Sequence, residues 1–286
     1  MSRRRRSAAA TAGLALLALA LWWITPANSP DVHAGLPQPQ DWRLRLSLHV
    51  LRNPGFTVGY SEWHRAPAWV AFRASSRFAE RGSRRLEDFS VDRRTLVRVS
   101  SGDYRGSGYD RGHLAPNYLI ARLYGAAAQR ATFLMSNVAP QTPRLNQLLW
   151  QRLEEAEADV IAPLAHELWI ITGPVFGGAR LPSGVSLPAA YWRIWLDLEP
   201  LRALAFMVPQ DVCGDEPLDR YAVSVDAVEA ATGLDFFAAM EDAAEARLEG
   251  ALEPRPWKLE SFARQPARYA DKFREPCKIT DTARPE

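Results

Sequence analysis

The segment YDRGHLAP at residues 109–116 is followed by SNVAPQ at 136–141 and LNQLLWQRLE at 145–154. These segments place histidine, arginine, asparagine and glutamate side chains at short intervals along the chain. On either side of them, strand-like and helix-like stretches are interspersed, with no internal repeat. That order predicts an α+β domain built around a mainly antiparallel sheet.

The flanking stretches give the expected elements. Alternating aromatic and β-branched residues at 55–72 predict two strands joined by a turn near Arg65, and an apolar run at 168–175 predicts a buried strand. We also expect an antiparallel strand pair at 191–198 and 203–208, and helices at 121–131, 145–162 and 224–231, the last of them ended by Gly233.

The polar residues of the first and third segments suit the cleavage of a phosphodiester. That reaction needs an activated water, stabilised charge on the phosphate and a neutralised leaving oxygen. His113 can accept a proton from water near neutral pH, and Arg111 can hold non-bridging phosphate oxygens. Gly112, between them, allows unusual backbone geometry or the close approach of a ligand. Asn146 offers a carbonyl oxygen to Mg²⁺, which prefers oxygen ligands and keeps several waters.

On a helix, Asn146, Trp150 and Glu154 would share one face because they are four residues apart. Asn146 and Glu154 would lie about 12 Å apart along the axis at roughly 1.5 Å per residue. Glu154 is therefore expected to reach back and hold metal-bound waters. Each residue also has a simpler explanation: Asn146 as a helix cap, Glu154 on a solvated face, and Trp150 in the core rather than as a base-stacking platform.

Taken together, the three segments strongly resemble the DNA/RNA non-specific endonuclease family, whose active site is a ββα-metal motif. The signature is Asp-Arg-Gly-His, then Ser-Asn-x-x-Pro-Gln, then Leu-Asn-Gln-x-x-Trp-x-x-Leu-Glu, and it stands here at 110–113, 136–141 and 145–154 without a gap. The resemblance covers about 55–240 and includes YWR at 191–193.

The resemblance implies a role for each matching residue. His113 would be the general base, Asn146 the direct ligand of Mg²⁺ (or Mn²⁺), and Glu154 a holder of metal-bound waters. Arg111 and Asn137 would support phosphate or the geometry of the site.

Asp110, in the same box as Arg111, is expected to bind substrate. One departure concerns an arginine that some secreted members carry one turn after the glutamate, where this chain has Ala158. Its role is either absent or taken by another residue, and the candidates are Arg152 and the arginines of 73–98.

The distribution of charge limits how nucleic acid could bind. The net charge of +2 becomes −2 without residues 1–28, which hold four arginines and no acid. A nucleic-acid footprint must therefore be a local patch. The stretch 73–111 has ten arginines against six acids, which suits either phosphate binding or a mixed, solvated surface.

The N-terminus has the pattern of an export address. Residues 1–28 combine a basic start with an uncharged apolar run at 8–24, which predicts either a cleaved signal peptide or a single-pass anchor in the inner membrane. We expect a linker at 29–50 and one nuclease domain at 51–286. The protein would then be periplasmic or extracellular. Its two cysteines, Cys213 and Cys277, could form a disulfide there or simply be buried.

Two functions follow from these observations. The first is a metal-dependent endonuclease that hydrolyses DNA and RNA with little sequence specificity, with a homodimer as one possible assembly. The second is a non-catalytic, membrane-attached module that binds nucleic acid and does not need His113. Because every motif residue is present, the first is favoured.

Overall fold

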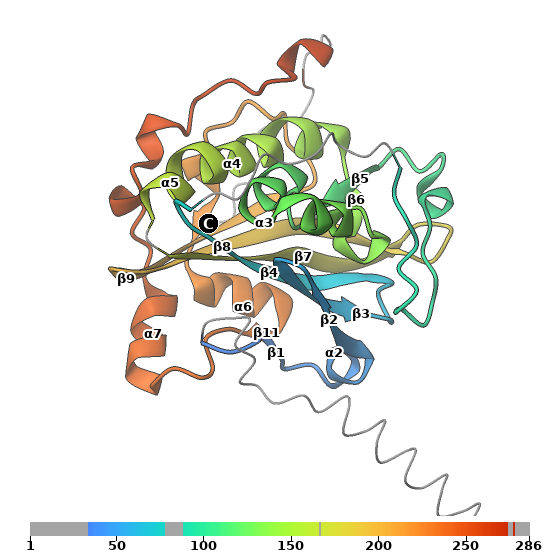
Figure 1. Ribbon diagram of the computed structural model, residues 1–286, viewed down its shortest axis with the longest axis horizontal. Coiled ribbons are helices and arrows are strands. Elements are labelled where there is room, and N and C mark those ends of the chain that lie inside the picture. Colours follow the sequence, from blue (N-terminus) through green and yellow to red (C-terminus); the bar gives the residue numbers. More distant parts are fainter. Residues whose placement is uncertain (1–33, 78–87, 166, 274–276, 278–286) are drawn as a thin grey trace, which may run out of the picture.

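The computed structural model describes residues 34–77, 88–165, 167–273 and 277. Its centre is a seven-stranded sheet in the order β10-β9-β8-β7-β4-β3-β2, in which every neighbouring pair is antiparallel. Figure 1 shows helices on both faces of this sheet. The strands are β2 (Leu48–Asn53), β3 (Phe56–Ser61), β4 (Ala66–Ala74), β7 (Leu168–Arg180), β8 (Ser186–Leu198), β9 (Leu201–Pro209) and β10 (Ala222–Val223). The predicted α+β class and the predicted strands are thereby confirmed.

Successive residues of the central strands enter two different cores. Trp69 on β4 packs below the sheet with Trp192, whereas its neighbour Val70 packs above the sheet with Trp195. Both faces are covered by helices, so a central strand is apolar at successive positions. This explains why β7 begins as an uninterrupted apolar run rather than an alternating one.

The upper layer, shown in green in Figure 1, carries the three segments at 109–116, 136–141 and 145–154. It holds α3 (Asn117–Thr132), which is interrupted at Gly125, where φ is 78°. The predicted helix at 121–131 is therefore confirmed with a break that the sequence analysis did not predict. The layer also holds a second, continuous helical stretch, which confirms the predicted helix at 145–162. That stretch consists of η3 (Leu145–Leu149), α4 (Trp150–Ala156), η4 (Glu157–Ile161) and α5 (Ala162–Leu164), of which η3 and η4 are π-helical.

The lower layer contains α6 (Val225–Thr232), which confirms the predicted helix and its end at Gly233. It begins one residue later than predicted because Ser224 caps it. The Ser224 hydroxyl accepts a hydrogen bond from the backbone N–H of Ala227 at 3.2 Å, and Gly233 ends the helix in the left-handed conformation with φ of 65°. The layer is completed by α2 (Trp42–Ser47), α7 (Asp242–Gly250) and the strand pair β1 (Gln38–Pro39) and β11 (Leu234–Asp235).

The predicted linker at 29–50 needs correction. Within it lie β1, α2 and the start of β2, and the side chains of Leu36 and Leu44 are buried in the lower core. Apolar and polar residues alternate from Trp42 to Val50, which favours a strand, but 42–47 form the helix α2. The local pattern is therefore overridden by contacts with distant parts of the chain. The predicted export segment, 1–28, lies outside the described residues. Within the part of the chain that the structure describes, no helix is long and apolar enough to cross a membrane.

Glu249, in the last turn of α7, is buried among other acidic side chains. Asp226 and Glu229 come from α6, Asp235 from β11, and Glu245 from the preceding turn of α7. Burial, and then the charges of Glu229 and Glu245, raise the pKa of Glu249 from 4.5 to about 8. The folded state therefore keeps a proton that the unfolded chain releases, so this group stabilises the fold below pH 4.5 and that contribution is lost as pH rises towards 8.

Glu249→Gln should raise the Tm at about pH 8.5 and leave it nearly unchanged at about pH 5, because glutamine keeps the side chain neutral at both. A gain of about 1–2 kcal/mol corresponds to roughly 2–8 °C in a chain of this size. Glu253→Gln removes one charge from an exposed position and is the control in thermal melts followed by circular dichroism. Melting at the wild-type temperature at the higher pH would contradict the prediction.

Candidate active site

The site is built on two short strands and the helical stretch that follows them. In β5 (Asp110–His113) and β6 (Val138–Gln141), which pair antiparallel, Asp110 lies opposite Gln141 and His113 opposite Val138. Gly112 is required because a Cβ there would overlap the Gln141 side chain. The space is therefore filled by a neighbouring side chain, so the close approach of a ligand, one of the two explanations that the sequence allowed, is wrong.

Asn137 fixes the loop that leaves β5. Its Oδ1 accepts from the backbone N–H of Ala115 at 2.9 Å, and its Nδ2 donates to the carbonyls of Ala115 and Thr132, both at 3.0 Å. The side chain is fully buried, so it does not face a substrate. Of the two roles expected for Asn137, this geometry favours support of the site, and it places Asn137 outside the catalytic group.

His113 lies at the end of β5 between two aromatic rings. The ring centroids of Phe89 and Phe133 are 5.0 and 5.1 Å from the imidazole centroid, and His113 is 9% exposed. These contacts restrict the orientation of the imidazole. The ring lines a cavity of about 420 Å³ that Asn146 and Glu154 also line.

Asn146 lies in the π-helical turn η3, and an acidic side chain holds its amide. The Nδ2 of Asn146 donates to Asp110 Oδ2 at 2.8 Å, and Gln147 Nε2 donates to the same oxygen at 2.7 Å. This orientation leaves Oδ1 of Asn146 as the atom for a cation.

Asp110 was expected to bind substrate. Its carboxylate instead orients the two amides, and its negative charge would repel a phosphate.

Glu154 reaches the cavity from α4 and is backed by a buried cation. Its Oε1 lies 4.0 Å from Nη1 of Arg193, which is fully buried. Nη2 of Arg193 donates to Glu157 at 2.6 Å, and its guanidinium lies 5.3 Å from the Trp150 ring centroid. Trp150 is buried in the upper core, so the prediction that it belongs to the core is confirmed. Its predicted place on one face with Asn146 and Glu154 is wrong, because Gln151 and not Trp150 lines the cavity with them after the π-helical turn η3.

Arg111 opens onto a second cavity beside the first. This cavity, of about 440 Å³, is lined by Arg105, Arg111 and Asp110, and also by Asn146. Because Asn146 lines both cavities, they meet at this side chain. Arg111 is exposed, with its guanidinium 5.1 Å from the ring centroid of Phe89, so it can approach a phosphate near Asn146.

Some secreted family members carry an arginine at the position of Ala158. The structure excludes one of the residues that could take over the role of that arginine. Arg152 is buried and donates to the carbonyls of Gly214, Glu216 and Ala263, so it is not free to reach a phosphate. Within the predicted stretch 73–98, Arg73 pairs with Glu167 and Arg94 with Asp92, whereas Arg98 donates to the Thr95 carbonyl. Arg81, Arg84 and Arg85 lie outside the described residues.

Comparison with known proteins identifies the family of the chain. The profile of the DNA/RNA non-specific endonuclease family matches residues 43–243, most of the chain. The chain belongs to the DNA/RNA non-specific endonuclease family. It is 31% identical over 227 residues to a nuclease of Nostoc sp., covering 73% of this chain and 81% of that protein. To the mitochondrial endonuclease G of Homo sapiens it is 30% identical, covering 63% and 67% of the two chains.

A further relative resembles the chain in sequence, and a solved structure resembles it in fold. A nuclease of Serratia marcescens is 27% identical, with 71% of this chain and 80% of that protein covered. A chain in the crystal structure of the EndoG/EndoGI complex superposes with a TM-score of 0.64 at 24% identity, covering 76% of this chain and 95% of that chain. The second likeness shows that the fold is shared.

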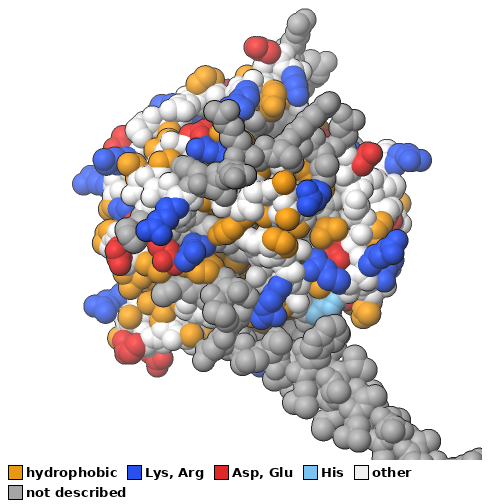
Figure 2. Space-filling model, viewed as in Figure 1, with side chains coloured by type: hydrophobic (Ala, Val, Ile, Leu, Met, Phe, Trp, Pro, Cys, Tyr) orange, Lys and Arg blue, Asp and Glu red, His pale blue; other side chains and the backbone are white. Residues whose placement is uncertain are grey.

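The surface of this endonuclease-family chain has no broad basic band on the side drawn in Figure 2. Lys and Arg side chains are dispersed there among acidic, polar and apolar ones. On this side, cations therefore occur in local groups and not as a continuous band. Several residues at the site escaped the sequence analysis: Gln147, Arg193, Arg268, Tyr269 and Lys272. Gln147 and Arg193 lie within the quoted motifs, whereas the other three follow no pattern.

Proposed function

We propose that this member of the family is a metal-dependent endonuclease that hydrolyses the phosphodiester bonds of DNA and RNA with little sequence specificity. The observation that carries the proposal is the meeting of His113, Asn146 and Glu154 on one cavity. The donor set fits a hard cation, because amide and carboxylate oxygens are the ligands that Mg²⁺ and Mn²⁺ prefer.

The residues divide the work of hydrolysis among them. His113, held between two aromatic rings, accepts the proton of the attacking water. Arg111 holds the non-bridging oxygens of the phosphate. Asn146 directly, and Glu154 through water, would hold the ion, which supplies positive charge at the phosphate and the leaving oxygen. Asp110 fixes the amide of Asn146, which leaves its oxygen as the atom that would hold the ion.

The test is cleavage of supercoiled plasmid and of a structured RNA, in Mg²⁺ and in EDTA. We expect both substrates to be degraded in Mg²⁺ and to remain intact in EDTA. Intact substrates in Mg²⁺, with salt-sensitive binding retained, would contradict the proposal and support the non-catalytic binding module.

Asp110→Asn should raise the Mg²⁺ concentration needed for half-maximal cleavage by about 10–100-fold, the usual cost of losing a group that orients a metal ligand. The neutral amide no longer accepts strongly from Asn146 and Gln147. Excess Mg²⁺ should restore part of the rate. Asp219→Asn, at an exposed position, is the control. Equal Mg²⁺ requirements of the two variants would rule out this role for Asp110.

The proposal includes export. Residues 1–28 have the pattern of a signal or anchor, and the disulfide between Cys213 and Cys277 suits an oxidising compartment. Fractionation of a Gram-negative host, with N-terminal sequencing, tests it. A shortened chain in the periplasm indicates cleavage, and a full-length chain in the inner membrane indicates an anchor. Protein found only in the cytoplasm would contradict export.

A further inference from the structure

The chain continues past the family match, which ends at residue 243, in a C-terminal arm that we define as residues 252–273. The arm contains three 3-10 turns: η6 (Arg255–Trp257), η7 (Leu259–Ser261) and η8 (Ala270–Lys272). Figure 1 shows it, in orange-red, rising from α7 in the lower layer past the edge of the sheet to the side of α4.

The first half of the arm is part of the upper core. Trp257, Leu259 and Phe262 are buried there, and the ring centroids of Trp257 and Trp195 are 5.6 Å apart. The arm is therefore held in place by apolar burial, which fixes the course of the residues that follow.

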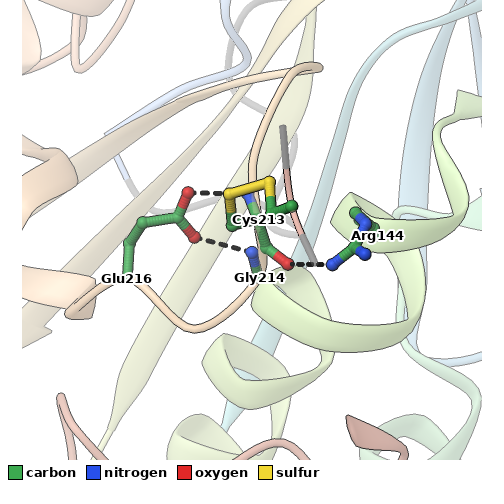
Figure 3. Close-up of a disulfide and its surroundings, with 5 residues drawn as sticks. Arg144, Cys213, Gly214 and Glu216 are labelled. Atoms are coloured by element: carbon green, nitrogen blue, oxygen red, sulfur yellow. Dashed lines mark hydrogen bonds between the residues drawn. A yellow bond between two sulfur atoms is a disulfide. The ribbon is translucent and has the colours of Figure 1, made fainter. Parts of the chain in front are cut away.

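Contacts at and just beyond the end of the arm fasten it beside the helix that carries Asn146. Cys277 forms a disulfide with Cys213, and Arg144 Nη1 donates to the Cys213 carbonyl at 3.0 Å (Figure 3). The guanidinium of Arg144 also lies 5.3 Å from the ring centroid of Phe273. Because Arg144 immediately precedes η3, these contacts join the arm to the metal-binding end of the helical stretch.

Three side chains of the arm line the same cavity as His113 and Asn146: Arg268, Tyr269 and Lys272. Arg268 Nε lies 3.1 Å from Glu155 Oε1, and the Arg268 side chain is 63% exposed. Lys272 Nζ lies 4.0 Å from the ring centroid of Tyr269 and is exposed. Exposed pairs of this kind contribute little to stability, so both cations can turn towards a stronger anionic partner.

Cations consequently flank Asn146 on two sides. Arg105 and Arg111 line one of the cavities that meet at Asn146, and Arg268 and Lys272 line the other. A nucleic-acid strand carries phosphates on both sides of the bond that is cut. Its backbone could therefore contact both pairs of cations while one phosphate lies at Asn146.

We propose that the C-terminal arm forms one wall of the nucleic-acid groove, and that Arg268 and Lys272 bind backbone phosphates flanking the scissile one. Tyr269 places its ring beside the Lys272 ammonium and restricts where that charge lies. The inference rests on the proposed function, since it assigns the substrate contacts of the same site. It places these contacts beyond the part of the chain that the family profile matches.

The test compares the double variant Arg268→Ala/Lys272→Ala with Arg255→Ala/Arg264→Ala, which removes two exposed cations of the arm that do not line the cavity. Binding of a fluorescent DNA duplex is measured by anisotropy in EDTA over a range of salt. The slope of log K against log salt should fall by about 1.8 for the first variant, at about 0.9 per phosphate contact, and stay near the wild-type value for the second.

Cleavage in Mg²⁺ separates this inference from the proposed function. The Arg268→Ala/Lys272→Ala variant should show a KM raised roughly tenfold, with kcat near that of the wild type, because the lost contacts bind the substrate and its transition state alike. If the wild-type protein cleaves and the two variants have identical salt slopes, the inference is overturned and the proposed function stands. Tighter DNA binding by Arg268→Ala/Lys272→Ala would also overturn the inference, because it would show that the arm obstructs the groove. A wild-type protein that does not cleave would overturn the proposed function, while the salt slopes in EDTA still decide the role of the arm.

Discussion

Replacing His113 with alanine should lower the rate of phosphodiester cleavage by about 10²–10⁴-fold, the usual contribution of a positioned general base. The imidazole is fixed between the rings of Phe89 and Phe133 at the cavity that Asn146 also lines. Alanine removes the proton acceptor and leaves the Asn146 amide and the surrounding cations in place. Nucleic-acid binding should therefore persist when cleavage is lost.

The measurement is the initial rate of plasmid relaxation in saturating Mg²⁺, with binding followed by anisotropy in EDTA. His64→Ala is the matched control, since His64 stacks on Phe176 outside both cavities at the site. That control should cut at nearly the wild-type rate. Recovery of part of the His113→Ala rate on addition of imidazole would support the role, whereas unchanged cleavage by that variant would assign the base to another group.

The sequence predicted the residues of the site better than their individual roles. His113, Asn146 and Glu154 could be predicted because the three motifs follow one another at the spacing typical of the family, and the structure brings all three to one cavity. The part of Asp110 could not be predicted from the motif. Its partner amides lie 36 and 37 residues away in the chain, and a sequence pattern does not show which polar atom faces which.

Helices and strands with a local sequence signal could be predicted, whereas those placed by distant contacts could not. Strands β7 to β9 and helix α6 have local signals, namely apolar runs and a terminal glycine, and these elements were predicted. The arm at 252–273 has no periodic pattern because only a few of its apolar side chains are buried. Its course is set by contacts with Trp195 and by the disulfide, both distant in sequence. Helix α2 was not predicted for the same reason: its burial depends on partners that are distant in the chain.

The second large effect concerns the buried ion pair behind the site. Glu157→Gln should lower the free energy of unfolding by about 3–5 kcal/mol, because it leaves the Arg193 guanidinium buried without its counter-charge. In a chain of this size the Tm should fall by roughly 6–20 °C. Asp159→Asn, which breaks the exposed pair with Arg122 at 3.0 Å, should cost less than about 1 kcal/mol. Equal costs of the two substitutions, measured by urea unfolding, would contradict the prediction.

A double variant distinguishes the stability of this pair from its contribution to the site. Glu157→Leu/Arg193→Met replaces both charges with apolar side chains and should recover much of the stability, since apolar replacement of a whole buried pair is often neutral or favourable. Activity should not recover with it. The Arg193 guanidinium also lies 4.0 Å from Glu154 and donates to the Leu114 carbonyl at 3.5 Å, directly behind His113. A variant that is stable yet slow would show that the buried charge is retained to hold Glu154 and the His113 loop in place, whereas one both stable and fully active would reduce the pair to a packing element.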